Sequence, residues 1–524
     1  MSEQEVPPLS TGTKLSYGVG QVADGLKNTA MATFVLFYYN QVLGLPGTLA
    51  GLALGIALVF DAVTDPVAGS ISDNLVSRLG RRHPFMYASA APLAVAFFLL
   101  FFPPASLLGQ WGLFAWLTGT VVMVRAAMTL YHVPHIALGA ELSDDYEERT
   151  TVVSFRTFFS TLGGLLAYVL GFGWFFADAR GGQVEASNYP PFAFAVAVLM
   201  AVTIFWSGWG TRQRIPYLRK PESGPDLSVG QVILRVFRDT GRALQNRSFR
   251  WLFSGVLIIF VMVGVDSALN LYMFNYFWEL PSAQILWLFL ALPVGALVGA
   301  PFTRYLHRFV NKHTTVLLGT TWFAVCELLP VLLRLVGWFP ENGTTLLFVI
   351  LLVVRFLMGL GAVQSTVSFN SMMADVADQH ELETHRRQEG IFFGAISFSA
   401  KGTSGLGNLV AGVGLDIIAW PRGADVRAAS DVAPETIVHL GILYGPLVAV
   451  FAVVSVWCLS HYDLTRERHA EIQAELNRRR AGMRPPFPPS SAEGGTAVAH
   501  GDKGRGEGFA AKAHSRDGTG PHQR

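Results

Sequence analysis

The sequence is poor in charged residues and in cysteine. Only 15% of its 524 residues are Asp, Glu, Lys or Arg, and the formal net charge is +2. So small a positive excess gives no reason to expect nucleic acid as a partner. The two cysteines, Cys326 and Cys458, lie far apart in apolar stretches. They therefore predict neither a disulfide framework nor a cysteine-based metal site.

Motifs of enzymes and of secretion are also missing. No Walker motif occurs, which argues against ATP as a driving force. The glycines of GVGQVADG lie in an apolar stretch rather than after a strand, so they do not predict a dinucleotide-binding loop. Residues 1–13 are polar, so no cleavable signal peptide is expected. With no nucleophile–base pair or metal-ligand constellation, we expect neither an enzyme nor a cofactor.

Apolar residues dominate the chain instead. They make up 51% of it and include 38 phenylalanines, a composition typical of polytopic membrane proteins. Twelve segments are long enough to cross ~30 Å of hydrocarbon. Their approximate ranges are 16–43, 47–75, 84–104, 111–140, 152–177, 190–210, 250–278, 284–306, 314–337, 344–373, 390–419 and 437–460. The sequence therefore predicts an all-α, multi-pass protein of the inner (plasma) membrane with twelve transmembrane helices.

Basic residues concentrate in alternate loops, above all between the sixth and seventh spans. The positive-inside rule then places both termini in the cytoplasm. The six-plus-six division suggests two halves with a binding site between them near the midplane of the membrane. The predicted parts are an N-terminal half (1–210), a central cytoplasmic loop with an amphipathic helix (211–249), a C-terminal half (250–462) and a largely disordered cytoplasmic tail (463–524).

The second span carries two acids, Asp61 and Asp65, which we call the acid pair. They are four residues apart and so share one face of a helix. A charge at membrane depth costs at least ~2.5–3.5 kcal/mol, and two like charges one turn apart cost more. Either basic side chains on neighbouring helices or a bound cation can offset this cost. Because intramembrane acids are usually functional, we predict a proton site or, with both carboxylates as ligands, a Na⁺ site.

A second signal follows this span, where G-x-x-x-D precedes G-R-R. Asp73 can pair with a basic neighbour or with the positive end of the next helix. Asp73, Arg81 and Arg82 are therefore predicted to form a conformational latch, with an ordinary positive-inside loop as the alternative. The spacing resembles the signature loop between helices 2 and 3 of the major facilitator superfamily.

Other ionisable residues lie within spans of the first half. Asp24 and Lys27 on the first span could neutralise each other or contact a substrate. Arg125 and His132 share a face of the fourth span, and Arg125 needs an anion, for which the acid pair is the obvious source. His132 could titrate near neutral pH or remain a neutral, hydrogen-bonded side chain.

The second half carries fewer such residues. Asp266 and Asn270 share a face of the seventh span, and Glu327 and Arg334 on the ninth are expected to form a structural pair. Lys401 is a lone ammonium well inside the eleventh span, where the acid pair or a bound substrate could neutralise it.

Taken together, the motifs resemble those of the glycoside–pentoside–hexuronide:cation symporters of the major facilitator superfamily. The matching segments lie in both halves and include KLSYGVGQ, FDAVTDPVAG, GRRHPF, the VP of YHVPHIALGAEL, ERTTVVSFR, MMADVADQHE, RRQEG and AKGTSG. The resemblance implies alternating-access symport of a sugar with Na⁺, Li⁺ or H⁺. It also implies that the acid pair holds the cation, that Lys401 lies near it, and that Arg156 contacts the sugar.

Three positions depart from the pattern of the family's best-studied member. Asp24-Gly25 stands where a Lys-Asp pair is expected, His132 replaces an aspartate, and Ile136 replaces an aromatic residue. Imidazole is a poorer ligand for a hard cation than carboxylate oxygen, but it binds protons well. The exchange at His132 therefore favours coupling to protons.

We thus predict a monomeric symporter that carries a sugar, glycoside or hexuronide with H⁺ or Na⁺ and contacts membrane lipid. A lysophospholipid or amphiphile carrier and a non-transporting sensor are the alternatives. Predicted cation-coupling residues are Asp61, Asp65, His132 and Lys401, and predicted substrate contacts are Asp24, Arg125, Arg156, Asp266, Asn270 and Gln364.

Overall fold

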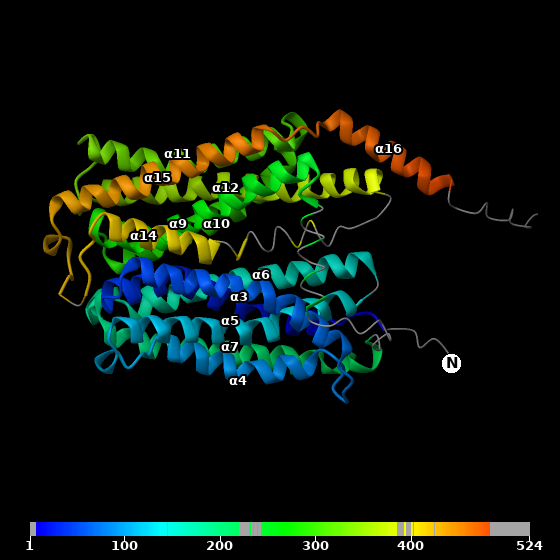
Figure 1. Cartoon of the computed structure of the whole chain (residues 1–524), viewed down its shortest axis with the longest axis horizontal. Helices are drawn as coiled ribbons and strands as arrows, with labels where there is room; N and C mark the ends of the chain where they lie inside the picture. Colours follow the sequence, from blue (N-terminus) through cyan, green and yellow to red (C-terminus); the bar gives the residue numbers. More distant parts are fainter. Residues whose placement is uncertain are drawn as a thin grey trace, which may run out of the picture. The chain divides into compact units, whose positions relative to one another are not determined.

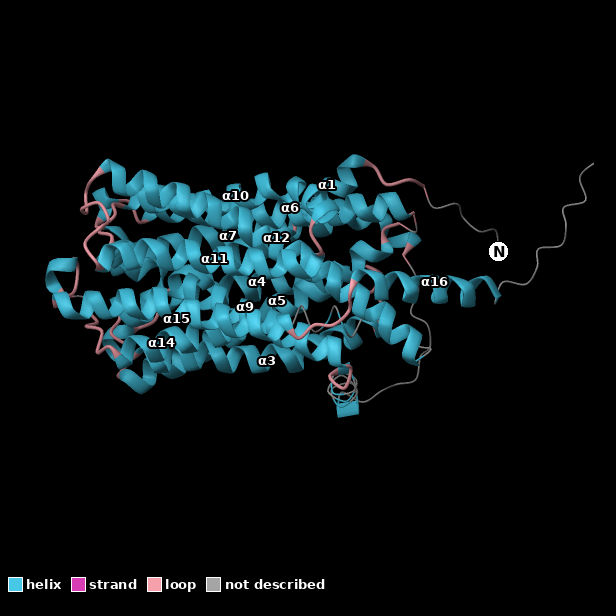
Figure 2. Ribbon diagram, turned by 90° about the horizontal axis from the view of Figure 1, so that it is seen from above, coloured by secondary structure: helices cyan, strands magenta, loops and turns pink. Residues whose placement is uncertain are grey.

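The computed structural model describes residues 7–143, 145–218, 243–384, 403–423 and 425–482, together with single positions within 230–241 and 392–401. All regular elements in these residues are helices (Figure 2). By its contacts the chain divides into a large unit, Met1–Ala474, and a terminal unit, Glu475–Arg524. The predicted all-α class is confirmed. The amphipathic helix predicted for the central loop lies largely outside the described residues.

Ten helices in the described part of the chain are long and apolar enough to cross a membrane. They correspond to ten of the twelve predicted spans. Those of the first half are α3 (Gly47–Asn74), α4 (His83–Leu100), α5 (Gln110–Glu141), α6 (Tyr146–Leu170) and α7 (Tyr189–Thr211). Those of the second half are α9 (Arg247–Tyr272), α10 (Ser282–Phe309), α11 (Lys312–Leu335), α12 (Thr345–Thr384) and α15 (Pro434–Ser460).

The other two predicted spans are interrupted or only partly described. Residues 11–42 are helical but change type along their length, through α1 (Thr11–Val19), α2 (Gln21–Ala30) and two π-helical turns, η1 (Met31–Val35) and η2 (Tyr38–Val42). The described end of the eleventh predicted span contains another π-helical turn, η10 (Thr403–Gly407), followed by α14 (Asn408–Ile417). Such turns often mark functional sites, and η1 and η10 each contact the opposite half, at α9 and α3 respectively.

The first part of the predicted tail is helical. Residues 466–482 form α16 (Arg466–Gly482), because Glu, Ala, Gln, Leu and Arg all favour helix and no proline interrupts them. Residues beyond 482 lie outside the described part of the chain.

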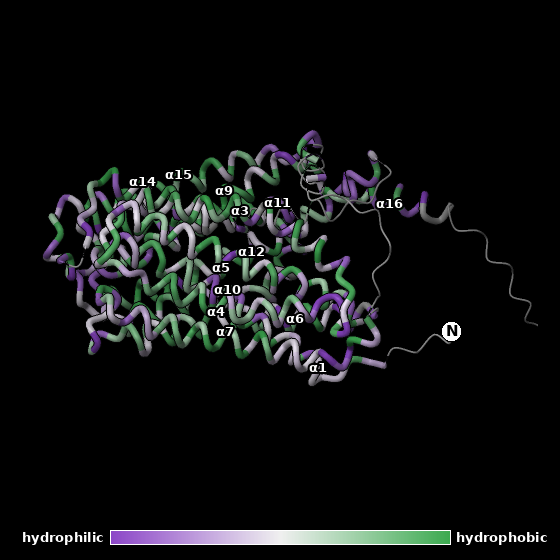
Figure 3. Tube along the Cα trace, turned by 60° about the horizontal axis from the view of Figure 1, so that its bottom comes forward, coloured by the Kyte–Doolittle hydropathy of each residue, from purple (hydrophilic) through white to green (hydrophobic). Residues whose placement is uncertain are grey.

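The helices form two groups that follow the sequence. Figure 1 shows the N-terminal helices, blue to teal, lying together and the C-terminal helices, green to orange, forming the other group. Hydrophobic residues run along the helices, whereas hydrophilic ones gather near the helix ends (Figure 3). Large apolar side chains point outward, for example Leu297 (76% exposed) and Phe302 (66% exposed). Such side chains are stable in contact with lipid, which agrees with a membrane-spanning fold.

The two halves are bonded to each other at one end, which we call the sealed end. There the Asp416 carboxylate, at the C-terminus of α14, accepts hydrogen bonds from the backbone N–H groups of Gly47 and Thr48 at 3.0 and 2.7 Å. The Trp420 indole donates to the Gln41 side chain at 2.7 Å. These bonds join the start of α3 to the end of α14.

Close packing of α3 on α14 depends on two glycines. A Cβ atom on Gly47 would collide with the carbonyl group of Gly412, and one on Gly412 would collide with that of Gly47. Small residues at a helix crossing let the two backbones approach closely in a membrane. The sealed end can therefore form only if neither position carries a side chain.

Replacement of Gly412 by Leu should separate α3 from α14. We expect a loss of about 1–3 kcal/mol, typical of overpacking, because neither backbone can give way without breaking the Asp416 bonds. The loss would be measured as a lower midpoint of thermal unfolding of the purified protein. Gly119→Leu is the matched control, since a Cβ there meets nothing within 4 Å. Equal midpoints for the two variants would contradict this account of the crossing.

Candidate functional site

The acid pair lies on α3, where α5 and residue 401 approach it. Arg125 on α5 donates to Asp61 in a buried ion pair. Lys401 pairs with Asp65 and lies 3.7 Å from Asp61 Oδ2. Thr129, one turn after Arg125, donates to Asp65 Oδ1 at 2.9 Å. Two basic side chains, one from each half, thus meet on the two acids, as the charge argument from the sequence requires.

The two acids differ in exposure. The side chain of Asp61 is 5% exposed, whereas those of Asp65 and Lys401 are 31% and 30% exposed. Asp61 Oδ1 is buried and accepts no hydrogen bond from a described residue. The Lys401–Asp65 contact is thus partly open, while the Arg125–Asp61 contact is shielded. Among the described residues no three Asp, Glu, His or Cys side chains are grouped to hold a metal ion.

Asp24 and Lys27 extend this group of charges. Lys27 Nζ lies 3.8 Å from Asp24 Oδ1, so the mutual pair, one of the two alternatives left open by the sequence, is present. Asp24 also interacts electrostatically with His132 and Lys401, and Lys27 interacts with Asp61 and Arg125. We call the six charged residues the ion cluster: Asp24, Lys27, Asp61, Asp65, Arg125 and Lys401. With three acids and three bases it is neutral when all six are ionised.

Arg156 lies in a neighbouring polar layer. It is next to the hydroxyl of Tyr17, whose ring stacks on His135 with a centroid distance of 4.3 Å. The His135 ring is hydrogen-bonded to the side chain of Gln21 at 2.9 Å and to the Tyr17 carbonyl at 3.0 Å. The sequence reasoning did not identify His135, although its place one turn after His132 could have signalled a shared face.

A second polar group lies in the C-terminal half. Arg355 on α12 donates to Asp266 at 3.2 Å, to Asn270, and to the hydroxyl of Tyr444 on α15 at 2.6 Å. Tyr444 donates in turn to Asp266 at 2.6 Å, and Asn270 donates to Asp266 at 3.1 Å. We call Asp266, Asn270, Arg355 and Tyr444 the Arg355 cluster. The sequence predicted roles for Asp266 and Asn270 but assigned none to Arg355 or Tyr444.

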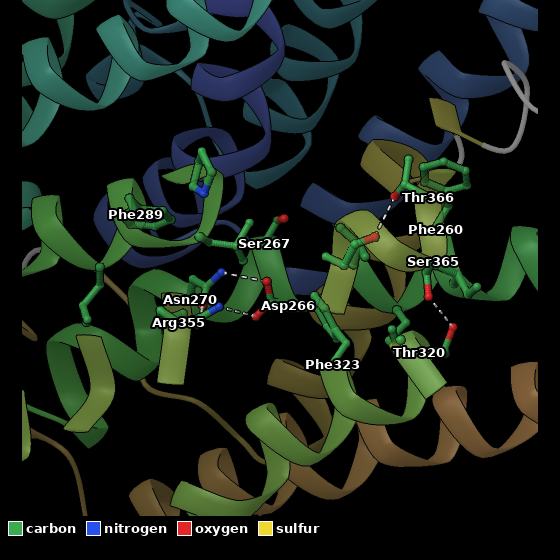
Figure 4. Close-up of a pocket in the computed structure, with 18 of the residues that line it drawn as sticks. Phe260, Asp266, Ser267, Asn270, Phe289, Thr320, Phe323, Arg355, Ser365 and Thr366 are labelled. Carbon is green, nitrogen blue, oxygen red and sulfur yellow. Dashed lines mark hydrogen bonds and ion pairs between the residues drawn. The ribbon is translucent and has the colours of Figure 1, made fainter. Parts of the chain in front are cut away.

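Three members of the Arg355 cluster, Asp266, Asn270 and Arg355, form the polar end of a cavity of about 250 Å³ (Figure 4). Aromatic and aliphatic side chains form most of the remaining wall, and Tyr168 on α6 is its contribution from the N-terminal half. Thr320, Ser365 and Thr366 add hydroxyl groups on the other side. The cavity can therefore enclose a small molecule that has a largely apolar surface and a few polar groups. The acid pair does not line it.

Two predictions for the second half differ from the structure. The predicted Glu327–Arg334 pair is wrong, because Arg334, near the end of α11, donates to the carbonyl of Pro340 at 3.0 Å while Glu327 faces Asp266 and Arg355. Gln364 donates to the Gly299 carbonyl at 2.9 Å and lines a separate apolar groove between α10, α11 and α12. It does not line the cavity that contains Asp266 and Asn270, so its predicted substrate contact gains no support.

The residues of the predicted latch meet at the end of the N-terminal half opposite the sealed end. Arg82 binds Asp73 at 2.5 Å and Glu141 at 2.7 Å, and Arg81 binds Glu141 at 2.9 Å. These pairs tie α3, α4 and α5 together. Glu141, at the end of α5, was missed by the sequence reasoning. Whether the group acts as a conformational latch stays a prediction.

The buried Arg125–Asp61 pair is open to a direct test. Asp61→Asn removes the carboxylate that Arg125 binds, and breaking a buried ion pair usually costs about 3–5 kcal/mol. Asp61→Asn combined with Arg125→Gln removes both charges and should recover much of that loss. Thermal unfolding of the purified variants measures the effect, with Glu341→Gln in an exposed loop as the control. A double variant no more stable than Asp61→Asn alone would contradict the pairing.

Comparison with known proteins fits this geometry. Residues 16–466 match a family model described as MFS/sugar transport protein. The isoprimeverose transporter of Lactiplantibacillus pentosus is 24% identical and covers 76% of this chain and 79% of its own. The putative glycoside/cation symporter YagG of Escherichia coli is 25% identical, over 94% of this chain and 99% of YagG. The sphingosine-1-phosphate transporter MFSD2B of Xenopus tropicalis is 23% identical, over 90% of this chain and 91% of MFSD2B.

The solved structures support the same fold. The nucleoside transporter NupG superposes with a TM-score of 0.58 at 11% sequence identity, and the alignment covers 87% of this chain and 100% of NupG. At that identity the likeness bears on the fold alone. The family match, the helices and the symporter relatives identify a multi-pass inner-membrane transporter rather than an enzyme. The chain belongs to the glycoside–pentoside–hexuronide:cation symporters of the major facilitator superfamily.

Proposed function

We propose that this transporter carries a sugar, glycoside or hexuronide in symport with H⁺ or Na⁺ by alternating access. The observation that carries the proposal is the position of Lys401. Its ammonium comes from the C-terminal half and sits on the acid pair of the N-terminal half. It is thus a tethered cation in the place where a coupling cation would bind, at a contact that joins the two halves.

Competition for Asp65 would couple ion binding to movement. A proton or Na⁺ on Asp65 neutralises its charge and weakens its attraction for Lys401. Because this contact is about one-third exposed, an ion can reach it without unfolding the helix. Release of Lys401 removes one bond between the halves. A bound ion therefore favours movement of the halves relative to each other, whereas the intact Lys401–Asp65 pair opposes it.

The surrounding side chains favour a proton over Na⁺. A proton needs a single basic atom, whereas Na⁺ needs several oxygen ligands, and Arg125 and Lys401 already occupy oxygens of the acid pair. His132, next to Asp24, would assist proton transfer. In this proposal the acid pair, His132 and Lys401 bind or exchange the cation.

The substrate would bind between the ion cluster and the Arg355 cluster. Asp24, Arg125 and Arg156 would supply polar contacts on one side, with Asp266 and Asn270 on the other. Tyr168 and Phe289, whose rings stack 4.6 Å apart, offer an aromatic wall for a sugar ring. The basic groups would favour an acidic sugar such as a hexuronide.

The proposal includes twelve spans and cytoplasmic termini. The end that carries Arg78, Arg81 and Arg82 would then face the cytoplasm. The sealed end would face the periplasm, so the structure would represent an inward-facing state. The protein is taken to work as a monomer.

An amphiphile is a second candidate substrate. The wall of the 250 Å³ cavity is mostly apolar, with charged groups at one end, which would suit an acyl chain with a polar head. The similarity to a sphingosine-1-phosphate transporter supports this alternative.

Uptake into proteoliposomes tests the proposed activity. Radiolabelled glycosides and glucuronides, with a lysophospholipid as the competing substrate, would be offered under an imposed H⁺ or Na⁺ gradient. We expect gradient-driven uptake of a glycoside or glucuronide, reduced at least tenfold in Asp65→Asn and retained in Glu341→Gln. Uptake of the lysophospholipid alone would favour the second candidate, and uptake that Asp65→Asn leaves unchanged would exclude the coupling mechanism.

Cysteine accessibility tests the orientation. Single cysteines would replace Glu341, in the loop between α11 and α12, and Arg78, after α3, in a protein whose two buried cysteines are changed to alanine. A membrane-impermeant maleimide should label residue 341 in intact cells, and residue 78 only after the cells are opened. The reverse pattern would place the termini outside.

A further inference from the structure

Glu327 is a buried acid that the transport proposal does not use. Its side chain is on α11, it is 4% exposed, and neither carboxyl oxygen accepts a hydrogen bond from a described residue. An ionised carboxylate in such a position loses its hydration and gains no hydrogen bond in exchange, which costs several kcal/mol. Its protonation state therefore needs an explanation from its neighbours.

The neighbours of Glu327 cannot neutralise it. The charged groups facing it are Asp266 from α9 and Arg355 from α12, with the Tyr444 hydroxyl from α15 and Cys326 on its own helix. From α10, Leu288 lies nearby and carries no charge. Arg355 is already bonded to Asp266, Asn270 and Tyr444. One guanidinium thus faces two carboxyl groups, so the group is neutral only if one carboxyl carries a proton.

The hydrogen-bond donors lead to the same result. Tyr444 has a single hydroxyl proton, which goes to Asp266 at 2.6 Å or to Asn270 at 2.9 Å. No donor of the Arg355 cluster bonds to either carboxyl oxygen of Glu327. A protonated Glu327, however, becomes a donor itself, and Asp266 is an acceptor beside it. The acid form therefore satisfies both the charge and the hydrogen bonding.

We propose that Glu327 and Asp266 form a second proton-binding site, in the C-terminal half and separate from the acid pair. One proton bonds to a carboxyl oxygen of Glu327 and is donated to the Asp266 carboxylate. Asp266 lines the 250 Å³ cavity, whereas Glu327 borders a small cavity of about 30 Å³ with Arg355 and Tyr444. Asp266 thus lies between the large cavity and Glu327, which is the route by which water there can exchange the proton.

Infrared spectroscopy of the purified protein in lipid tests this site. Subtraction of the Glu327→Gln spectrum from the wild-type spectrum at mildly acidic pH should leave one carboxylic-acid C=O band that shifts in D₂O. The band should be lost from Glu327→Gln, displaced in Glu327→Asp and unchanged in Glu341→Gln, an exposed control. No transported substrate is needed, so the result does not depend on the proposed symport.

The competing state is an ionised Glu327 hydrated by water in the 30 Å³ cavity, which has room for about one molecule. It predicts carboxylate bands but no acid C=O band in the wild-type minus Glu327→Gln spectrum, and that result would overturn the proposal. If Glu327→Gln does not fold, the wild-type minus Glu327→Asp spectrum gives the same decision. In that spectrum, one acid C=O band from Glu327 and a second, displaced band from the aspartic acid support the site, and the absence of both overturns it.

Discussion

Charge neutrality inside a low-dielectric interior governs the placement of polar residues in this molecule. A helix that carries two carboxylates at membrane depth is stable only where other groups balance them. Arg125 and Lys401 supply that balance for Asp61 and Asp65. The identity of the donors matters, because Arg125 is on a helix of the same half and Lys401 comes from the opposite half. The same requirement that stabilises the fold therefore also connects its two halves.

The two ion pairs of the acid pair differ in their exposure to solvent, and this suits them to different roles. The shielded Arg125–Asp61 pair resembles a structural bond, since water cannot easily compete for it. The partly exposed Lys401–Asp65 pair is weaker in effect, because solvent screens it and ions can reach it. A transporter needs a contact that can break on each cycle beside one that does not. The sealed end adds hydrogen bonds that the Asp416 carboxylate and the Gln41 side chain accept. Arg422 lies 3.2 Å from Asp416, so opening these bonds does not leave the carboxylate without a basic partner.

The two polar centres differ in their balance of acidic and basic side chains. The ion cluster takes five residues from the first half and Lys401 from the second, and it balances three acids with three bases. A bound ion must therefore displace or join an existing pair. The Arg355 cluster together with Glu327 has one base for two acids, so it lacks a positive charge that a proton can supply. The polar centres therefore differ in what each can bind, although both face the boundary between the halves or a cavity close to it. The π-helical turns η1 and η10 lie at that boundary, where irregular backbone permits close contact.

The sequence by itself determined the membrane class, the approximate limits of ten spans, and the need for partners at Arg125, Lys401 and the acid pair. These follow from hydropathy and from the cost of burying charge, both of which are properties of local sequence. It also gave the Asp24–Lys27 contact as one of two alternatives, because spacing along one helix fixes which side chains share a turn. Only the tertiary structure decided which helix supplies each partner. In the structure Glu327 faces Asp266 instead of Arg334, Tyr444 contacts Arg355, and Gln364 lines a separate groove. These contacts depend on how each helix is rotated about its axis relative to its neighbours. Nearly uniform apolar helix surfaces do not reveal that rotation in the sequence.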